Sequence, residues 1–545
     1  MSGFRVAGWA MAVLTAGMAV VAFPPHAQEG AGWFCLVPLL CAMRAGWADW
    51  RHGWLAGALF WFGTMWWLAH VTVVGMVLLC IYLGGYWAAW CWLVGRAHGR
   101  FPEATTRSNL AIALVAAVGW VGLDAVRGWA LSGFPWNGLG VSQFENLGVI
   151  QIARLGGVEL VTWLVVFANA IGALTIVRFY REMRRAQKMK PHFDFSVCMA
   201  LVAASFAWGI QEIWRKPPAE PRKVRVGFVQ GNVPQEQKFD PREAHGILER
   251  YLNLTAFLAG GGAGGGCPDI ILWPETATGT GIFQDRALTE AVAGMMREAG
   301  HSLLMGSIDV DGGRFYNGGV LFLPREGGYR VYRKERLVPF GEFVPLRGWM
   351  PWLANLAGMP GDYTPGDGSD AVLEAPSASG PVAMGLLICF EDTLPALARR
   401  RAARGARLLV NLTNDGWFRD SPGAWLHVAN AVFRCIETGL PMVRCANTGV
   451  SCVIEPTGRI PEIPLMDGGR AVGLSGAFGR EVALPDLGGP TVYVRWGHLF
   501  PLCCLALTAC YVAYEFVRDR KRLRAAGPIR AAQEVSLTSP PSGGG

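Results

Sequence analysis

Residues 385–392 read Gly-Leu-Leu-Ile-Cys-Phe-Glu-Asp, an apolar run that ends in a cysteine and two acids. Near-continuous apolar runs of this kind are typical of strands that are buried on both faces of a sheet. We therefore predict a strand over Val382–Ile388 and the start of a helix after it, with Cys389 between them. The amide groups and dipole at a helix N-terminus favour the thiolate, which is the nucleophilic form of cysteine. A lone cysteine is, however, more often a small buried apolar residue.

Two further apolar runs lead directly into charged residues. One ends at Trp273 and is followed by Glu275, and the other ends at Arg333 and is followed by Lys334 and then Glu342. Loops that follow strands often carry catalytic groups. Taken singly, Glu275 also suits the first turn of a helix, and Lys334 also suits a solvated charged strand.

These segments belong to a stretch of about 270 residues, 220–490, that we expect to form one folded domain. We predict strands over Val224–Gln230, Asp269–Trp273, Ser302–Ile308, Gly319–Leu323, Tyr329–Arg333, Val382–Ile388, Ala406–Asn411 and Val450–Ile454. We predict helices over Glu243–Leu258, Ala287–Glu298, Leu394–Arg404 and Ala424–Thr438. The mixture indicates a layered α/β or α+β domain. An αββα sandwich fits it, although periodicity does not separate this fold from other layered folds.

The rest of the chain is apolar. Hydrophobic residues make up 52% of the 545 residues and charged residues only 17%, where soluble domains have about 25%. This composition excludes a soluble protein and a disordered one. We predict a polytopic α-helical membrane domain with about eight transmembrane helices. The eight apolar runs lie at 4–22, 31–47, 53–70, 72–95, 108–130, 155–178, 196–214 and 493–516.

The basic residues indicate how the chain crosses the membrane. Every second short loop is rich in Lys and Arg, for example 178–190 and 518–524, whereas the alternate loops carry almost none. By the positive-inside rule both termini are then cytoplasmic, and the domain at 220–490 lies on the far side. The predicted organisation is a membrane domain at 1–219, the α/β domain at 220–490, a last helix at 491–518 and a disordered tail at 519–545.

The three charged or thiol-bearing segments resemble the three signatures of the nitrilase (carbon–nitrogen hydrolase) superfamily, in the same order and at similar separations. The segments are Trp273-Pro274-Glu275, Lys334 to Glu342 and Ile388-Cys389-Phe390-Glu391. The resemblance implies an αββα sandwich and a catalytic triad of Glu275, Lys334 and Cys389. In this reading Glu275 is the general base and acid, Lys334 stabilises the oxyanion and Cys389 is the nucleophile. Glu342 orients Lys334 or assists proton transfer, and Glu391 shapes the pocket.

Four further motifs resemble the apolipoprotein N-acyltransferases, a membrane-bound branch of that superfamily. They are Gly133–Trp136, Gly231–Gln235, Leu337–Pro345 and Asn414–Phe418. The resemblance implies the last step of bacterial lipoprotein maturation, in the inner membrane, with the α/β domain in the periplasm. A phospholipid donates its sn-1 acyl chain through a cysteine thioester to the α-amino group of a diacylglyceryl-cysteine at an apolipoprotein N-terminus. Two positions depart from the pattern, since Phe390 replaces a common tyrosine and Phe239 a common tryptophan.

Aromatic and apolar residues around these motifs are candidates for lipid binding. The candidates are Phe239, Trp349, Met350, Trp352, Phe390 and Trp417. The segment that follows Glu342 would be an exposed apolar patch on a soluble domain, and such patches often mark interaction sites. We expect it to dip into the bilayer and gate lipid entry. The alternative is an ordinary core segment.

We expect no cofactor, no metal and no nucleic-acid partner. The sequence has no CxxC or HxxxH spacing, and its basic runs lie beside the spans, where anionic lipid headgroups account for them. We expect a monomer. One or two disulfides among Cys267, Cys435, Cys445 and Cys452 are compatible with an oxidising compartment, with the pairing left open.

Two other functions fit parts of the sequence. A membrane-tethered amidase or nitrilase would use the same triad with water as the acceptor. A transporter with an inactive nitrilase-like domain would carry ionisable residues within its spans. The few candidates for that role lie near the predicted span ends: Asp124, Arg127, Arg154 and Glu159.

Overall fold

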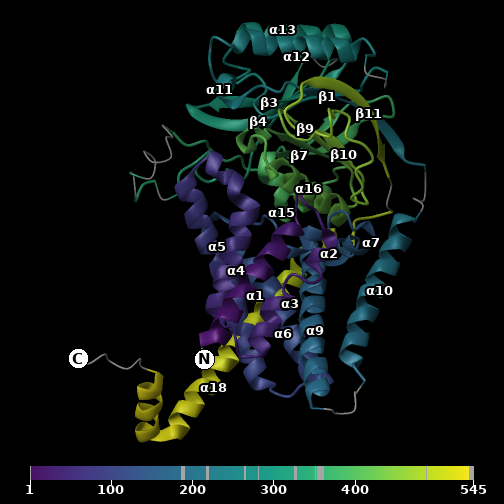
Figure 1. Cartoon of the computed structure of the whole chain (residues 1–545). Coiled ribbons are helices and arrows are strands. Elements are labelled where there is room, and N and C mark those ends of the chain that lie inside the picture. The colour runs from purple at the N-terminus through teal and green to yellow at the C-terminus, as the bar shows by residue number, and fades with distance from the viewer. Residues whose placement is uncertain are drawn as a thin grey trace.

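The structure, a computed structural model, describes residues 2–185, 191–215, 220–262, 266–279, 281–324, 328–345, 347–349, 352, 361–485 and 488–538. It has a helical bundle, formed by α1 to α10 and α18, and an α/β domain, formed by the elements from β1 to β11 (Figure 1). In the α/β domain α12 and α13 lie farthest from the bundle, two sheets follow, and α15 and α16 face the bundle (Figure 1). The predicted αββα sandwich and helical membrane part are confirmed.

Two sheets form the centre of the α/β domain. The six-stranded sheet has the order β11 (Gly476–Leu484), β1 (Arg222–Gln230), β2 (Ile270–Trp273), β3 (Ser302–Asp311), β4 (Arg314–Phe322) and β5 (Tyr329–Arg333). The five-stranded sheet has the order β10 (Cys452–Ile454), β9 (Met442–Ala446), β8 (Leu408–Thr413), β7 (Val382–Ile388) and β6 (Val372–Ala375). β1, β2 and β3 are parallel, as are β7, β8 and β9.

Apolar side chains from both sheets fill the space between them. Leu272 and Leu304 from the first sheet and Leu386 and Val410 from the second belong to one fully buried cluster. Burial on both faces explains why these strands are almost continuously apolar. The outer faces are covered by helices, namely α11 (Gln235–Lys238), α12 (Ala244–Ala259), α13 (Arg286–Ala299), α15 (Pro395–Ala403) and α16 (Gly423–Thr438).

All eight strands and all four helices predicted for this domain overlap observed elements, but three strands were missed. β6 and β11 are edge strands, and β11 carries two glycines and two charged residues, so its pattern is weak. β9 carries the buried Arg444 in its centre, and a charge at that position breaks the apolar run. In each case pairing with a neighbouring strand decides the structure.

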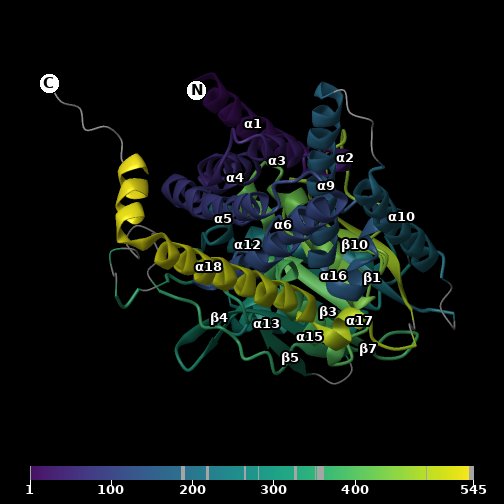
Figure 2. The same cartoon turned by 90° about the horizontal axis from the view of Figure 1, so that it is seen from below.

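Five helices of the bundle, among the described residues, are long and apolar enough to cross a membrane. They are α5 (Val73–Arg100), α6 (Thr106–Arg127), α9 (Val158–Arg184), α10 (Phe193–Ile213) and the part of α18 (Leu499–Thr538) up to Arg522. α18 packs along α6 (Figure 2) and continues beyond residue 518, where the sequence places the end of the last span. The count of eight spans stays a prediction.

The other elements outside the α/β domain are shorter. They are α1 (Ser2–Val21), α2 (Glu29–Gly32), α3 (Val37–Arg44), α4 (Trp50–Met65), η1 (Trp66–His70), η2 (Ala130–Ser132), η3 (Leu139–Gln143), α7 (Leu147–Ile150), α8 (Ala153–Gly156) and, before α18, α17 (Val492–Trp496). The run at 31–47, predicted as one span, is therefore broken between α2 and α3. The segment from η2 to α8 lies between the bundle and the α/β domain, where η3 and α8 pack against α16.

Side chains from other helices satisfy the backbone at the break between α2 and α3. The Leu36 amide donates to Asn169 Oδ1 (2.8 Å), and Asn169 Nδ2 donates to the Gly32 carbonyl (2.9 Å). The Leu39 amide donates to Thr15 Oγ1 (3.1 Å). Irregular backbone at membrane depth is tolerated only where other protein groups satisfy it. Asn169, which is fully buried in α9, therefore permits this break.

Asn169→Leu should destabilise the bundle, because it removes the partners of Leu36 and Gly32. Each unsatisfied buried group costs about 1–3 kcal/mol. Thermal unfolding of the purified protein in detergent measures this loss. Ser205→Ala is the matched control, since Ser205 is half-buried on α10 and its hydroxyl donates to the Leu201 carbonyl of the same helix. An unfolding temperature equal to that of the wild type would show that Asn169 does not support the break.

Candidate active site

Three strand ends bring Glu275, Lys334 and Cys389 together. β5 is antiparallel to β4 and β4 to β3, so β5 runs in the direction of β3 and β2. The ends of β2 and β5, with Glu275 and Lys334 just beyond, therefore lie at one edge of the first sheet. Cys389 follows β7 of the second sheet. All three side chains are at least 92% buried, and the thiol lies within electrostatic range of both charges.

Lys334 lies between two carboxylates. Its Nζ is 2.9 Å from Glu342 Oε1 and 3.3 Å from Glu275 Oε1. The second oxygen of Glu342 accepts the Val338 amide at 2.8 Å. Burial lowers the pKa of Lys334, but Glu342 and Glu275 outweigh burial and raise it above its ordinary value. Lys334 therefore remains an ammonium at neutral pH.

Asn317 is a member of this site that the sequence analysis missed. Its Nδ2 donates to Oε1 of Glu275 and to Oε1 of Glu342, both at 2.7 Å, and its backbone carbonyl accepts the Lys334 amide at 2.8 Å. Asn317 lies within β4, one strand away from Lys334. No local signal marks it, because its role depends on the pairing of β4 with β5.

Lys238 was missed as well. This side chain is 2% exposed, and its Nζ donates to the Glu275 carbonyl at 2.7 Å. Burial lowers the pKa of Lys238 to about 8, and the charges of Glu275 and Cys389 oppose this change. Its position three residues after the Gly231–Gln235 motif is the one signal that could have found it. Lys238 fixes the backbone of Glu275 and places a second amine near the thiol.

The thiol of Cys389 is protonated at neutral pH. Burial and the carboxylates of Glu275 and Asp415 raise its pKa above the ordinary value, whereas Lys334 and, to a smaller extent, the Thr413 hydroxyl lower it. The expectation that Cys389, the first residue of η4 (Cys389–Thr393), is a thiolate is therefore wrong, since burial and the two carboxylates outweigh Lys334 and Thr413. The nucleophile needs a base, and Glu275 is the nearby carboxylate. Cys389 also has a positive φ of 52°, which is unfavourable for a residue with a side chain.

Glu391 connects the segment of Lys334 with the turn of Cys389. Its two fully buried oxygens accept four hydrogen bonds. The donors are the amides of Ile388 (2.8 Å), Glu335 (2.8 Å) and Arg336 (3.0 Å) and the hydroxyl of Tyr332 (2.8 Å). Glu391 thus acts on the backbone around the predicted triad, and no hydrogen bond joins it to the triad side chains.

The predicted aromatic residues lie in three places. The centre of the Phe390 ring lies 5.7 Å from Lys334 Nζ. Phe239 follows α11 and Trp417 lies in η5 (Asp415–Phe418). Both side chains are half-exposed, and a hydrogen bond from Asn414 to Gln235 (2.8 Å) joins the two segments. Trp349 and Trp352 are 90% and 60% exposed, so they are not core residues, and Met350 lies outside the described residues.

The segment that carries Trp349 and Trp352 begins and ends at the site. The Tyr363 amide donates to the Glu342 carbonyl at 2.8 Å, and Arg347 pairs with Asp362 at 2.8 Å. This segment therefore begins at Glu342, whose carboxylate holds Lys334.

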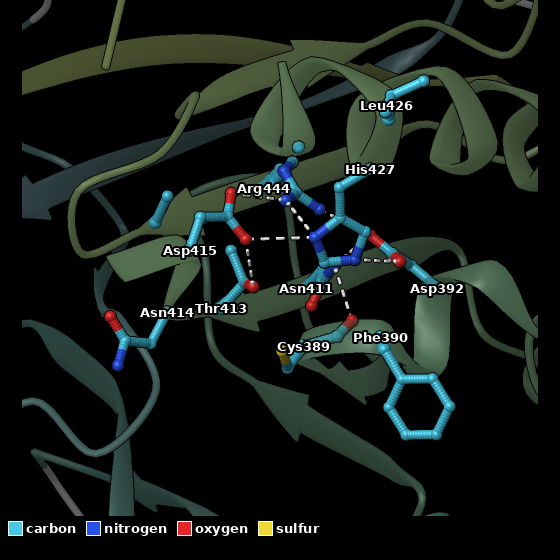
Figure 3. Close-up of polar contacts among 12 residues, drawn as sticks. Cys389, Phe390, Asp392, Asn411, Thr413, Asn414, Asp415, Leu426, His427 and Arg444 are labelled. Atoms are coloured by element: carbon cyan, nitrogen blue, oxygen red, sulfur yellow. Dashed lines mark hydrogen bonds and ion pairs between the residues drawn. The ribbon is translucent and has the colours of Figure 1, made fainter. Parts of the chain in front are cut away.

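A second charged cluster lies behind Cys389 (Figure 3). His427 lies between two aspartates, with Nε2 2.6 Å from Asp392 and Nδ1 3.0 Å from Asp415, and Arg444 contacts both aspartates at 2.5 and 2.8 Å. Burial would raise the pKa of Asp415, but Arg444 and His427 lower it to about 2. Burial and Arg444 lower the pKa of His427, but the two aspartates outweigh them and raise it.

The described residues contain no cluster of three or more His, Cys, Asp and Glu side chains that could hold a metal ion. All thirteen cysteines lie in the described ranges, and each is a free thiol, including Cys267, Cys435, Cys445 and Cys452.

The raised pKa of Cys389 predicts slow alkylation of this thiol at neutral pH. Its reaction with iodoacetamide, followed at the peptide level by mass spectrometry, should have a midpoint above about pH 9. Lys334→Met should move the midpoint further up and slow alkylation about tenfold at pH 9, because a positive charge that favours the thiolate is lost. The control is Lys223→Met, which removes an exposed lysine that is also paired with a carboxylate, Glu481. A wild-type midpoint below about pH 8 would contradict this account of the thiol.

Two family models match the chain. The model described as apolipoprotein N-acyltransferase N-terminal domain matches residues 15–171, and the model described as carbon-nitrogen hydrolase matches residues 225–462. The solved amidase of the nitrilase superfamily from Nesterenkonia AN1 is 19% identical, with a TM-score of 0.36 over 52% of this chain and 96% of its own.

Curated relatives match over almost the whole chain. The apolipoprotein N-acyltransferase of Geobacter metallireducens is 31% identical over 530 residues, which is 93% of this chain and 95% of the relative. That of Azotobacter vinelandii is 33% identical over 511 residues, which is 89% of this chain and 90% of the relative. Such identity across both the bundle and the α/β domain favours an acyltransferase over a tethered amidase. The chain belongs to the apolipoprotein N-acyltransferase family.

Proposed function

We propose that this protein transfers the sn-1 acyl chain of a phospholipid through a thioester on Cys389 to the α-amino group of a diacylglyceryl-cysteine at an apolipoprotein N-terminus. The observation that carries the proposal is the buried group of Glu275, Lys334 and Cys389 at the meeting point of two sheets. Its position in a chain with several apolar helices supports lipid substrates, because a soluble amide would need no such bundle.

The first half-reaction forms the acyl-enzyme. Glu275 takes the proton of the Cys389 thiol, and the thiolate attacks the ester carbonyl of the phospholipid. The ammonium of Lys334 stabilises the oxyanion of the tetrahedral intermediate. The C–O bond then breaks, and the lysophospholipid alcohol leaves with the proton from Glu275.

The second half-reaction uses the same groups. The α-amino group of the acceptor attacks the thioester carbonyl, and Glu275 takes a proton from the attacking nitrogen. The C–S bond breaks as the amide forms, and the proton on Glu275 returns to the sulfur. Because the lysophospholipid leaves before the acceptor reacts, the kinetics are ping-pong.

Glu342 and Asn317 serve the reaction by holding Lys334 and Glu275. Glu342 accepts from the Lys334 ammonium, and Asn317 donates to the carboxylates of Glu342 and Glu275, so the four polar groups keep one arrangement when water is excluded. Lys238 holds the Glu275 backbone from the other side. The charges are therefore in place before the substrate binds. Charges fixed in this way stabilise the transition state, because they need no rearrangement during the reaction.

The enzyme acts as a monomer in the bacterial inner membrane, with both termini in the cytoplasm and the α/β domain in the periplasm. The alternation of basic loops supports this orientation. The loop with Trp349, Met350 and Trp352 enters the outer leaflet and gates lipid entry. The high exposure of Trp349 and Trp352 supports this role, since exposed tryptophans favour the membrane interface.

An acyl-enzyme should form when the purified protein meets a defined phospholipid. Intact-protein mass spectrometry should show one fatty-acyl adduct that hydroxylamine releases and that Cys389→Ser lacks. A diacylglyceryl peptide with a free N-terminus should discharge it, whereas an N-acetylated copy of that peptide should not. Glu275→Ala and Lys334→Ala should lower adduct formation by at least about a hundredfold. Discharge by water at the rate seen with the free peptide would identify a hydrolase instead.

Trp349→Glu should slow acyl-enzyme formation from phospholipid vesicles about tenfold, because a charge disfavours entry of the loop into the bilayer. The unfolding temperature should stay unchanged, since Trp349 is 90% exposed. Phe257→Glu is the matched control, an exposed aromatic on α12, far from the bundle (Figure 1). If Trp349→Glu formed the acyl-enzyme from vesicles at the wild-type rate, the segment with Trp349 would have no role in lipid entry.

A further inference from the structure

The charged cluster behind the nucleophile takes no part in the acyl transfer outlined above. We define it as Asp392, His427, Asp415 and Arg444, which come from η4, α16, η5 (Asp415–Phe418) and β9 and are each at most 1% exposed. We propose that this cluster positions Cys389 for attack, that Thr413 and His427 are positioning residues, and that Trp136 of the helical bundle completes the cluster. The inference rests on the proposed role of Cys389 as the nucleophile.

One arm of the cluster leads toward Cys389. Thr413 Oγ1 lies 3.1 Å from Asp415 Oδ1, and the Thr413 hydroxyl lowers the pKa of the Cys389 thiol. A hydroxyl has one hydrogen, so Thr413 donates either to Asp415 or to the sulfur. Asp415 already accepts from His427 and Arg444, so it does not depend on Thr413. The Thr413 hydrogen is therefore available to a thiolate as soon as the thiol loses its proton.

The other arm reaches the backbone of Cys389. His427 donates from Nε2 to Asp392 Oδ1, and the second oxygen of Asp392 accepts from Asn411 Nδ2. The same Nδ2 lies 3.3 Å from the Cys389 carbonyl. This contact restrains a residue whose positive φ makes its turn unfavourable without outside support. Figure 3 shows His427 between the two aspartates, with Cys389, Asn411 and Thr413 beside them.

The helical bundle closes the cluster from outside the α/β domain. Trp136 is 5% exposed, and the centre of its ring lies 5.2 Å from the centre of the His427 ring. Arg127 of α6 holds that segment by donating to the carbonyls of Phe134 (2.6 Å) and Trp136 (2.8 Å). Phe418 lies beside both rings. The centre of its ring is 6.2 Å from that of Trp136 and 6.1 Å from that of His427. The Gly133–Trp136 motif thus keeps water away from the cluster, and its charges interact mainly with one another.

The test uses the full chain in detergent and measures Cys389 alkylation by iodoacetamide over a range of about pH 7 to 11 at the peptide level. Thr413→Val keeps the shape of threonine and removes the hydroxyl hydrogen that is available to a thiolate at Cys389. It should raise the midpoint and slow alkylation at pH 9 about tenfold, because hydrogen bonds to charged groups are strong. Thr413→Ser should restore the wild-type profile. The matched control is Thr438→Val, because the Thr438 hydroxyl bonds within α16 to the Arg434 carbonyl.

His427→Gln and Trp136→Leu test the cluster and its cover. Each should shift the alkylation profile in the same direction as Thr413→Val. Combining either one with Thr413→Val should shift the profile by less than the sum of the two single shifts. Trp136→Leu keeps apolar bulk and lies outside the α/β domain, so it tests the proposal even if His427→Gln does not fold.

Two results would overturn the proposal. One is a wild-type alkylation profile for folded Thr413→Val. The other is a lower unfolding temperature for His427→Gln or Trp136→Leu with an unchanged profile, which would give the cluster a structural role alone. Because alkylation needs no phospholipid, these results stand whether or not the chain forms an acyl-enzyme.

Discussion

The site depends on a buried ammonium that must be compensated. Removing a lysine from water costs several kcal/mol unless opposite charges and hydrogen bonds replace the solvent. Lys334 meets this requirement with Glu342 and Glu275, and Asn317 donates to both carboxylates. Each partner comes from a different segment, so the burial of one charge specifies where β4, the end of β2 and the turn at Glu342 must lie.

The same constraint extends to the second sheet and to the bundle. Glu391 joins the segment after Lys334 to the turn of Cys389 through four donors, so the two sheet edges keep their spacing. α16 lies between the second sheet and the bundle, and nearly all of its residues are buried. Its apolar side chains share one core with the bundle helices. The site is therefore packed against the apolar helices, and the ring centre of Trp136 lies 5.2 Å from the ring centre of His427, behind Cys389.

Local sequence predicted much of the fold because local physics decides it. Strands buried on both faces must be apolar throughout, and helices that meet lipid must be long and apolar, so both leave clear patterns. Where tertiary contacts replace such patterns, prediction failed. The run at 31–47 looks like a span, yet Asn169 from a distant helix satisfies the backbone where it breaks. β9 was missed because Arg444 interrupts its apolar run, and the two aspartates that compensate this charge lie far away in sequence.

The sequence by itself determined that a carboxylate, an ammonium and a thiol each follow a strand, and that Glu342 follows Lys334 at a turn. These residues lie at element ends, where composition changes abruptly and leaves a visible mark. Only the tertiary structure decided that Asn317, Lys238 and His427 belong with them. Asn317 and His427 lie within elements that carry no mark of their own, and Lys238 has only its nearness to the Gly231–Gln235 motif. It also decided that Cys389 keeps its proton. A pKa depends on burial and on charges brought near by folding, and neither is a property of the local sequence.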